Sequence, residues 1–191
     1  ALGTVVATCE LQRPEVGMVI LDGRTGRGHA TSRALIKTGG VLKTMKRDVS
    51  FRSDVNGTDA CREILSSGTL LDGLLKRHTP HTIRFVHAPK SNAASGTRAP
   101  SVLLFSSISA LLGSSGQANY ASANSSLDFI ARDRRRIGVD NCSIQFGPWS
   151  ESGMATRHAQ TLQRLESMGI FGLGPDQSMY LLHTAIAKAV I

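Results

Sequence analysis

The sequence contains few cysteines, few aromatic residues and no long apolar run. The three cysteines, Cys9, Cys61 and Cys142, lie far apart, and this spacing gives neither a disulfide framework nor a set of metal ligands. Buried or idle thiols in a reducing, cytoplasmic compartment are the simplest interpretation. We find neither the run of about 18 apolar residues that a bilayer-spanning helix needs nor the pattern of a signal peptide. We therefore expect a cytoplasmic protein with no metal and no membrane partner.

Charge of one sign is in excess. The chain has 22 Lys and Arg against 14 Asp and Glu, which gives a net charge of +8. Such an excess suits nucleic acid, an anionic membrane or an acidic protein partner. Aromatic residues make up only 5% of the chain and do not alternate with basic ones, as a base-stacking surface requires. The densest basic cluster, from Arg132 to Arg136, is typical of a solvated helix end, so we expect no nucleic-acid binding.

Apolar runs alternate with amphipathic stretches along the whole chain. This order predicts an α/β fold, a Rossmann-like doubly wound parallel sheet with flanking helices, built from residues 1–191 as one domain. Ser101 to Phe105 is the clearest buried strand. The expected strands are 16–21, 41–49, 101–105 and 141–146, and the expected helices are 31–38, 70–75, 119–132, 161–168 and 176–190. Residues 91–100 are expected to form a loop or a frayed helix.

The stretch SVLLFSSISALLGSSGQANYASAN, residues 101–124, carries the strongest chemical signal. Its strand delivers Ser107 to the carboxyl end, a loop with glycines follows, and Tyr120 lies near the start of a helix. The two residues are 13 positions apart, so strand, loop and helix can bring both hydroxyls to one point. Ligands of open α/β sheets bind outside the carboxyl ends of the strands. We therefore expect the functional site there.

This stretch resembles the short-chain dehydrogenase/reductase superfamily and, more closely, the ketoreductase domains of type I polyketide synthases. GTLLDGLLKRHTP at 68–80 and SIQFGPWSESGMA at 143–155 extend the resemblance in the same order. It implies a doubly wound sheet of that superfamily's type. It also implies NADPH-dependent reduction of a β-ketoacyl thioester, carried by an acyl carrier protein, to the β-hydroxyacyl thioester. The implied partners are the carrier protein, which is acidic and would meet the basic surface, and the neighbouring domains of a synthase.

The resemblance implies four catalytic residues. Tyr120 would donate a proton to the ketone oxygen, and Ser107 would hydrogen-bond that oxygen. Position 124 is Asn where the wider superfamily has Lys. In polyketide ketoreductases the lysine comes from upstream, and Lys90 in HAPK matches it. Its charge is expected to lower the pKa of Tyr120, while Asn124 would hold the proton relay.

The resemblance also implies residues on the cofactor and substrate sides. Arg24 would face the 2′-phosphate that distinguishes NADPH. Asp72 is kept in LLD, and Leu112 stands eight residues before the tyrosine where the opposite class has Trp, so B-type stereochemistry with a D-configured hydroxyl is expected. The implied cofactor-binding residues are Gly3, Arg24, Asp48, Gly68, Gly147, Pro148 and Trp149, and the implied substrate residues are Asp72, Leu112, Gln117 and Met154. Each alone has a plainer interpretation: Trp149 as core, Asp72 as a turn residue.

The resemblance is incomplete, and this leaves alternatives open. We expect the chain to begin inside the glycine-rich phosphate turn and to stop where a last strand would start, so the domain would be truncated at both ends. The spans 48–68 and 90–107 are also short for the family. The eroded glycine motif would suit a catalytically silent structural domain of a multienzyme. The ketoreductase of a fatty acid synthase is the other alternative, although GPW at 147–149 favours the polyketide form.

Overall fold

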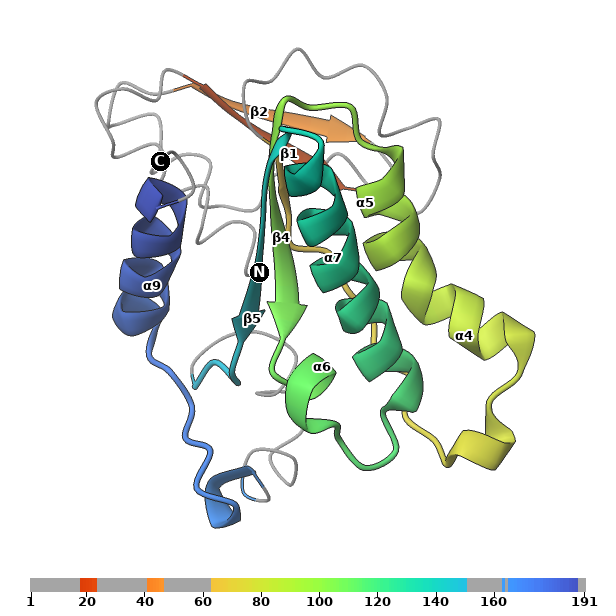
Figure 1. The fold of residues 1–191 in the computed structure, drawn as a ribbon. Helices are drawn as coiled ribbons and strands as arrows, with labels where there is room; N and C mark the ends of the chain where they lie inside the picture. The colour runs from red at the N-terminus through yellow and green to blue at the C-terminus, as the bar shows by residue number, and fades with distance from the viewer. Residues whose placement is uncertain (1–17, 24–40, 47–62, 151–162, 164, 189–191) are drawn as a thin grey trace. The chain divides into compact units, whose positions relative to one another are not determined.

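The computed structural model of the chain describes residues 18–23, 41–46, 63–150, 163 and 165–188, drawn as a ribbon in Figure 1. The chain divides into two compact units, Ala1–Val49 and Ser50–Ile191, and each is described by itself. In the described part of the chain, no helix combines the length and the apolar character that a membrane span requires.

The first unit contains a parallel pair of strands. β1 (Met18–Gly23) and β2 (Val41–Lys46) pair with Met18 opposite Val41 and Gly23 opposite Lys46. Parallel neighbours need a crossover connection between them, as expected for βαβ units. Both predicted strands are confirmed with shifted ends, and the helix predicted at 31–38 lies outside the described residues.

The second unit is built on a parallel three-stranded sheet in the order β3 (Glu63–Leu65), β4 (Ser101–Ser107), β5 (Asp140–Phe146). The central strand β4 is buried from Val102 to Ser106, as an apolar strand covered on both faces should be. Its last residue, Ser107, pairs with Phe146, the last residue of β5. The carboxyl ends of these two strands therefore lie at the same level.

Two helices, α4 (Pro80–His87) and α7 (Ala118–Arg136), pack against each other, and α7 also packs on β4 and β5 (Figure 1). α4 begins at a capping box in which Thr79 and Thr82 exchange hydrogen bonds, with Pro80 in its first turn. α7 ends where Gly138 adopts a left-handed φ of 81°, a conformation that glycine accepts without cost. α9 (Pro175–Lys188) packs on β5.

Short helical elements complete this unit. They are a 3-10 turn η2 (Leu75–Arg77), a π-helical turn η3 (Ala88–Asn92), and the one-turn helices α5 (Ala93–Gly96) and α6 (Ser109–Leu112). Residues 91–96, expected as a loop or frayed helix, are thus helical. The start of a helix predicted at 70–75 is wrong, because residues 66–74 have no regular structure. Of the helix predicted at 161–168, residues 163 and 165–167 are helical, and Met168 lies in the turn that follows.

The core is a mixture of aliphatic and aromatic packing. Leu104, Leu127, Leu182 and Val86 are almost fully buried. The rings of Phe105 and Phe146 lie 4.7 Å apart between centroids, and Phe146 is followed by Trp149 at 5.7 Å. The predicted α/β architecture, a parallel sheet with flanking helices, is therefore confirmed.

Candidate active site

The site is built at the carboxyl end of β4 and the start of α7. Ser107 ends the strand, and its hydroxyl oxygen accepts a hydrogen bond of 3.2 Å from the Ser109 backbone N–H. Tyr120 lies in the first turn of α7. The loop between them returns the chain so that the phenol comes beside the strand end, as the sequence predicts.

Tyr120 is only 9% exposed and packs with Val86, Ala123 and Leu70. Burial raises the pKa of the Tyr120 phenol, and hydrogen bonding by the side chains of Asn124 and Ser107 lowers the pKa by less. The effect of the Lys90 charge on this pKa stays a prediction, and the net shift is upward because burial dominates. The cost of burying a phenolate outweighs the groups that stabilise it.

Lys90 is the cation beside this tyrosine. It lies in the π-helical turn η3 and is 4% exposed, and its ammonium nitrogen is 5.3 Å from the centre of the Tyr120 ring. The ammonium donates a 2.9 Å hydrogen bond to the carbonyl oxygen of Phe105 on β4. Burial lowers the pKa of Lys90 to about 8, against the opposing charge of Asp128. Strongly shifted lysines and single π-turns both concentrate at functional sites.

Asp128 is itself fixed. Its two carboxylate oxygens accept hydrogen bonds from the Ser143 hydroxyl at 2.6 Å and the Gln145 amide at 2.8 Å, both on β5. The strand β5 thus holds in place the negative charge that raises the pKa of Lys90 against the effect of burial.

Asn124 is fully buried one turn after Tyr120. Its amide nitrogen donates to the Tyr120 carbonyl oxygen at 2.9 Å, and its own backbone carbonyl accepts from the Ser106 hydroxyl at 3.3 Å. The amide oxygen of Asn124 has no hydrogen-bond partner among the described residues. A buried polar atom without a partner is costly, so this oxygen offers an acceptor to a bound group. The structure therefore brings together the four residues predicted as catalytic.

The loop 66–74, which precedes α4, is fastened to the beginning of α7. The Gln117 amide nitrogen lies 3.2 Å from each carboxylate oxygen of Asp72, and the Gly73 backbone N–H donates to the Gly116 carbonyl at 2.8 Å. The Asn119 amide adds a 2.9 Å bond to the Leu71 carbonyl. Two predicted substrate residues are thus in direct contact. Asn119 was missed, and its only signal is its place immediately before Tyr120.

The remaining predicted residues are placed less decisively. Leu112 is 61% exposed at the end of α6, and Gly68 lies partly buried in the loop after β3. Gly147 and Pro148 directly follow β5, and a Cβ at Gly147 would meet nothing within 4 Å. Four predicted residues lie outside the described residues: Gly3, Arg24, Asp48 and Met154.

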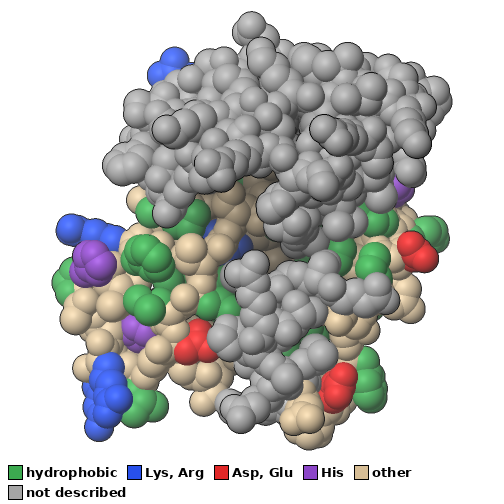
Figure 2. All heavy atoms as spheres, turned by 180° about the vertical axis from the view of Figure 1, so that it is seen from behind, with side chains coloured by type: hydrophobic (Ala, Val, Ile, Leu, Met, Phe, Trp, Pro, Cys, Tyr) green, Lys and Arg blue, Asp and Glu red, His purple; other side chains and the backbone are tan. Residues whose placement is uncertain are grey.

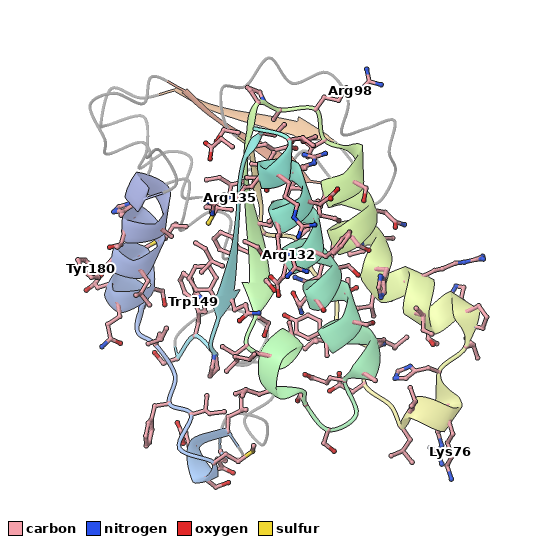
Figure 3. All side chains as sticks on the ribbon, in the orientation of Figure 1. Lys76, Arg98, Arg132, Arg135, Trp149 and Tyr180 are labelled. Atoms are coloured by element: carbon pink, nitrogen blue, oxygen red, sulfur yellow. The ribbon has the colours of Figure 1, made fainter. Side chains whose placement is uncertain are left out.

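Trp149 is a core residue in this structure. It is buried between β5 and α9 (Figure 3), its ring is tilted by 55° against that of Phe146, and its backbone forms a parallel β-bridge with Leu173. The plainer interpretation of Trp149 therefore fits its surroundings, although its indole N–H has no partner among the described residues. No group of three or more His, Cys, Asp or Glu that could hold a metal is found in the part that the structure describes.

The parallel sheet, with Ser107, Tyr120 and Asn124 where β4 ends and α7 begins and with Lys90 beside them, has the architecture of the short-chain dehydrogenase/reductase fold. The family model described as the KR domain matches residues 1–151, and the chain belongs to this family of polyketide synthase ketoreductase domains.

Its relatives are large synthases. The spectinabilin polyketide synthase system protein NorA' of Streptomyces orinoci is 40% identical over 133 residues, which are 65% of this chain and 4% of that protein. The NorB protein of the same system is 30% identical over an alignment of 209 residues, 98% of this chain and 10% of that protein. A solved structure of A-type ketoreductases from a modular polyketide synthase matches with a TM-score of 0.86 at 26% identity, covering 95% of this chain and 42% of that one. The chain thus spans less than half of that solved chain and a small part of each of the two synthases.

Proposed function

We propose that this chain carries the catalytic centre of a reductase that uses NADPH to convert a β-ketoacyl thioester on an acyl carrier protein to the β-hydroxyacyl thioester. The observation that carries the proposal is the buried Lys90 ammonium 5.3 Å from the Tyr120 ring centre. Burying a lysine beside a tyrosine costs stability, and such costly, strongly shifted groups concentrate at functional sites. Proton donation by the phenol is the task that this pair performs best.

The proposed proton transfer starts at the Tyr120 hydroxyl. The phenol gives its proton to the ketone oxygen as the carbonyl carbon is reduced, and the hydroxyl of Ser107 hydrogen-bonds the same oxygen. The tyrosine is left as a phenolate, which burial disfavours. The charge of Lys90 then stabilises the phenolate until a proton returns from solvent. With the hydride that NADPH would supply and the proton from Tyr120, the products are the alcohol and NADP+.

The residues at the strand ends fit a nicotinamide cofactor. Gly147 follows β5 at the level of Ser107 and leaves open space where a side chain would be, so a flat ring could approach the backbone. The Asn124 amide oxygen adds a buried acceptor without a partner among the described residues. When bound, NADPH supplies the hydride. The choice of NADPH over NADH rests on the resemblance at Arg24.

We propose B-type stereochemistry for the product. The proposal rests on Asp72 and on Leu112 in place of Trp. The contact between Asp72 and Gln117 supports it, since it holds the loop beside the start of α7, the helix that carries Tyr120. The solved reductase described above is named A-type, so the configuration of the alcohol is a direct test of this assignment.

The carrier protein would be bound through charge. Arg132 and Arg135 stand exposed on the last turns of α7 (Figure 3). Figure 2 shows separate Lys and Arg side chains at one margin of the described surface, with acidic side chains elsewhere on the same face. Exposed arginines on α7 would raise the rate of encounter with an acidic partner.

The decisive experiment compares two tyrosine variants, since the chain has only two tyrosines. Tyr120→Phe removes the proposed donor, whereas Tyr180→Phe alters a residue of α9 that is 72% exposed. NADPH binding is followed by its fluorescence, and turnover by loss of nicotinamide absorbance with the N-acetylcysteamine thioester of a β-keto acid. We expect Tyr120→Phe to bind NADPH and lose turnover by at least about 100-fold, and Tyr180→Phe to behave as the parent chain.

Two outcomes would contradict the proposal. Turnover by Tyr120→Phe at the parent rate would remove the tyrosine from its role. Absence of NADPH binding both by this chain and by a version extended upstream of Ala1 would favour a silent structural domain of a synthase.

A further inference from the structure

One imidazole ring joins the two segments that carry Lys90 and Tyr120. His87 is the last residue of α4, and its Nδ1 lies 3.0 Å from the Ser91 hydroxyl oxygen. Its Nε2 lies 2.9 Å from the hydroxyl oxygen of Ser122 on α7. Ser91 directly follows Lys90, and Ser122 comes two residues after Tyr120. The ring is therefore linked within a few bonds of the backbone to both residues of the proposed proton-donating pair.

The direction of these hydrogen bonds follows from counting protons. The Ser122 hydroxyl donates its one proton to the Asn119 carbonyl at 2.9 Å, so it accepts from His87 Nε2, which must carry a hydrogen. Nδ1 is then free to accept from the Ser91 hydroxyl, whose other acceptor, the His87 carbonyl, lies farther away at 3.3 Å. Burial lowers the pKa of His87, which favours this neutral form. The neutral ring thus satisfies both bridges.

The chain of hydrogen bonds continues into the substrate-side loop. Asn119, which receives the Ser122 proton, also accepts at its amide oxygen from the Tyr120 backbone N–H at 2.8 Å. Its amide nitrogen holds the carbonyl of Leu71 at 2.9 Å, next to Asp72. One network therefore connects the end of α4, the first turns of α7 and the loop.

The other contacts between α4 and α7 at this point are apolar. Val86 and Ala123, the neighbours of His87 and Ser122 in sequence, are fully buried in one cluster with Tyr120. Apolar contact holds the helices together but does not fix direction, and hydrogen bonds do fix it. The bridge through His87 supplies such hydrogen bonds between α4, the turn after it and α7.

We infer that His87 is a positioning residue for the proposed reduction: through Ser122 it fixes the turn that carries Lys90 against the helix that carries Tyr120. This inference rests on the proposed function. Without the bridge, the turn that carries Lys90 would lose a hydrogen-bonded link to α7, while the ammonium would keep its hydrogen bond to the Phe105 carbonyl on β4. The separation of 5.3 Å between the ammonium and the ring centre would then vary.

Four variants test the inference. Ser122→Ala and His87→Ala each remove the bridge to α7. His87→Gln keeps an N–H donor near the position of Nε2 and should rescue it. Ser126→Ala is the matched control, since its hydroxyl also sits on α7 but donates to the Ser122 carbonyl at 2.9 Å and is not bonded to His87.

The first measurement is the split between kcat and KM with the model thioester. Because small misplacements of reacting groups cost rate rather than binding, we expect Ser122→Ala and His87→Ala to lower kcat about tenfold with KM and NADPH affinity within about twofold. His87→Gln should keep at least about half of the parent kcat if an N–H donor at this point is what matters. Ser126→Ala should leave both constants unchanged.

The second measurement needs no turnover. Competitive acetylation at limiting reagent, read by peptide mass spectrometry, reports how protected the Lys90 amine is. We expect Lys90 to react about fivefold faster in Ser122→Ala and His87→Ala as its segment opens more often, and at the parent rate in Ser126→Ala and His87→Gln. Parent-like labelling and parent-like kcat in Ser122→Ala would overturn the inference. Faster labelling in a chain that shows no reductase activity would uphold the clamp and reject the proposed function.

Discussion

The Lys90 ammonium lies 5.3 Å from the centre of the Tyr120 ring and is held there by the Phe105 carbonyl at 2.9 Å. Burial shifts the pKa values of the two side chains in opposite directions. It lowers the pKa of Lys90 to about 8 and raises the pKa of Tyr120. Near neutral pH the pair is therefore an ammonium beside a neutral phenol. That is the protonation state that a proton donor with a waiting counter-charge requires.

The first prediction concerns pH. Lys90 carries its charge below its pKa of about 8 and loses it above, and the phenolate formed during reduction then loses its partner. We expect kcat to fall as pH rises through about 8, measured from pH 6 to 9.5 at saturating NADPH and thioester. NADPH affinity over the same range is the control. A kcat that stays level to pH 9.5 would show that the Lys90 charge takes no part.

The second prediction concerns Asp128, whose negative charge raises the pKa of Lys90 against the effect of burial. Asp128→Asn removes that charge but keeps the shape of the side chain, so the pKa of Lys90 should drop further. We expect the alkaline fall in kcat to begin at lower pH, by roughly half to one pH unit. Asp133→Asn, an exposed position on the same helix, is the matched control. If both variants shift the profile equally, the effect is one of net charge.

Much of this site could be predicted from the sequence, for physical reasons that differ between residues. The apolar run of β4 can only be a buried strand, and the distance from Ser107 to Tyr120 leaves room for a loop and a first helical turn. The strand end and the helix start can therefore meet through the short segment between them, with little dependence on the rest of the chain. The resemblance supplied Lys90, which lies in a separate segment.

Other features depend on tertiary contacts that no local pattern reports. LLDGLL at 70–75 has the composition of a helix, but its backbone groups are bonded instead to Gly116 and Asn119. Tertiary bonds of this kind outweigh a helix propensity of a few tenths of a kcal/mol per residue. The same holds for the upward shift of the Tyr120 pKa. A charge can be placed from a motif, whereas the degree of burial that opposes it cannot.

The third prediction is that Lys90 destabilises the fold that it serves. A pKa lowered from 10.5 to about 8 in the folded state costs about 3 kcal/mol at pH 7, as an upper bound. Lys90→Met should therefore raise the free energy of unfolding while kcat falls by about 100-fold. Urea unfolding at pH 7 measures the gain. Lys76→Met, at an exposed position in η2, is the control and should change little.

The cost of burying the Lys90 charge also predicts how the free energy of unfolding changes with pH. Between about 8 and 10.5 the unfolded chain still binds the lysine proton and the folded chain does not, so this group makes the parent chain more stable as pH rises through that window. We expect the contribution to be missing in Lys90→Met, so that the gain in stability over the parent chain shrinks from pH 7 to pH 10. A gain that stays constant with pH would mean that it does not come from the shifted pKa of Lys90, and a loss at pH 7 would mean that the Phe105 hydrogen bond outweighs the cost of burial.

The fourth prediction concerns the contact between Asp72 and Gln117, tested by exchanging the amide and the carboxylate. Gln117→Glu would put a carboxylate within about 3 Å of the Asp72 carboxylate, and two like charges at that distance repel strongly. The loop should then release, and the Gly73 amide, bonded to the Gly116 carbonyl at 2.8 Å, should exchange with solvent at least about tenfold faster. The double variant Asp72→Asn with Gln117→Glu restores one amide and one carboxylate with their places reversed, so protection of Gly73 should return.

Chiral analysis of the alcohol made by the parent chain, Gln117→Glu and the double variant distinguishes two possible causes of the stereochemistry. One is the position of the loop, and the other is the charge of Asp72. If position alone sets the configuration, the D-configured share falls in Gln117→Glu and recovers in the double variant together with Gly73 protection. If the carboxylate must stand at position 72 itself, protection recovers and the D-configured share does not. An unchanged product in all three, with the loop demonstrably released in one, would remove the contact from stereochemical control, because a substrate guided by this loop must respond when the loop moves.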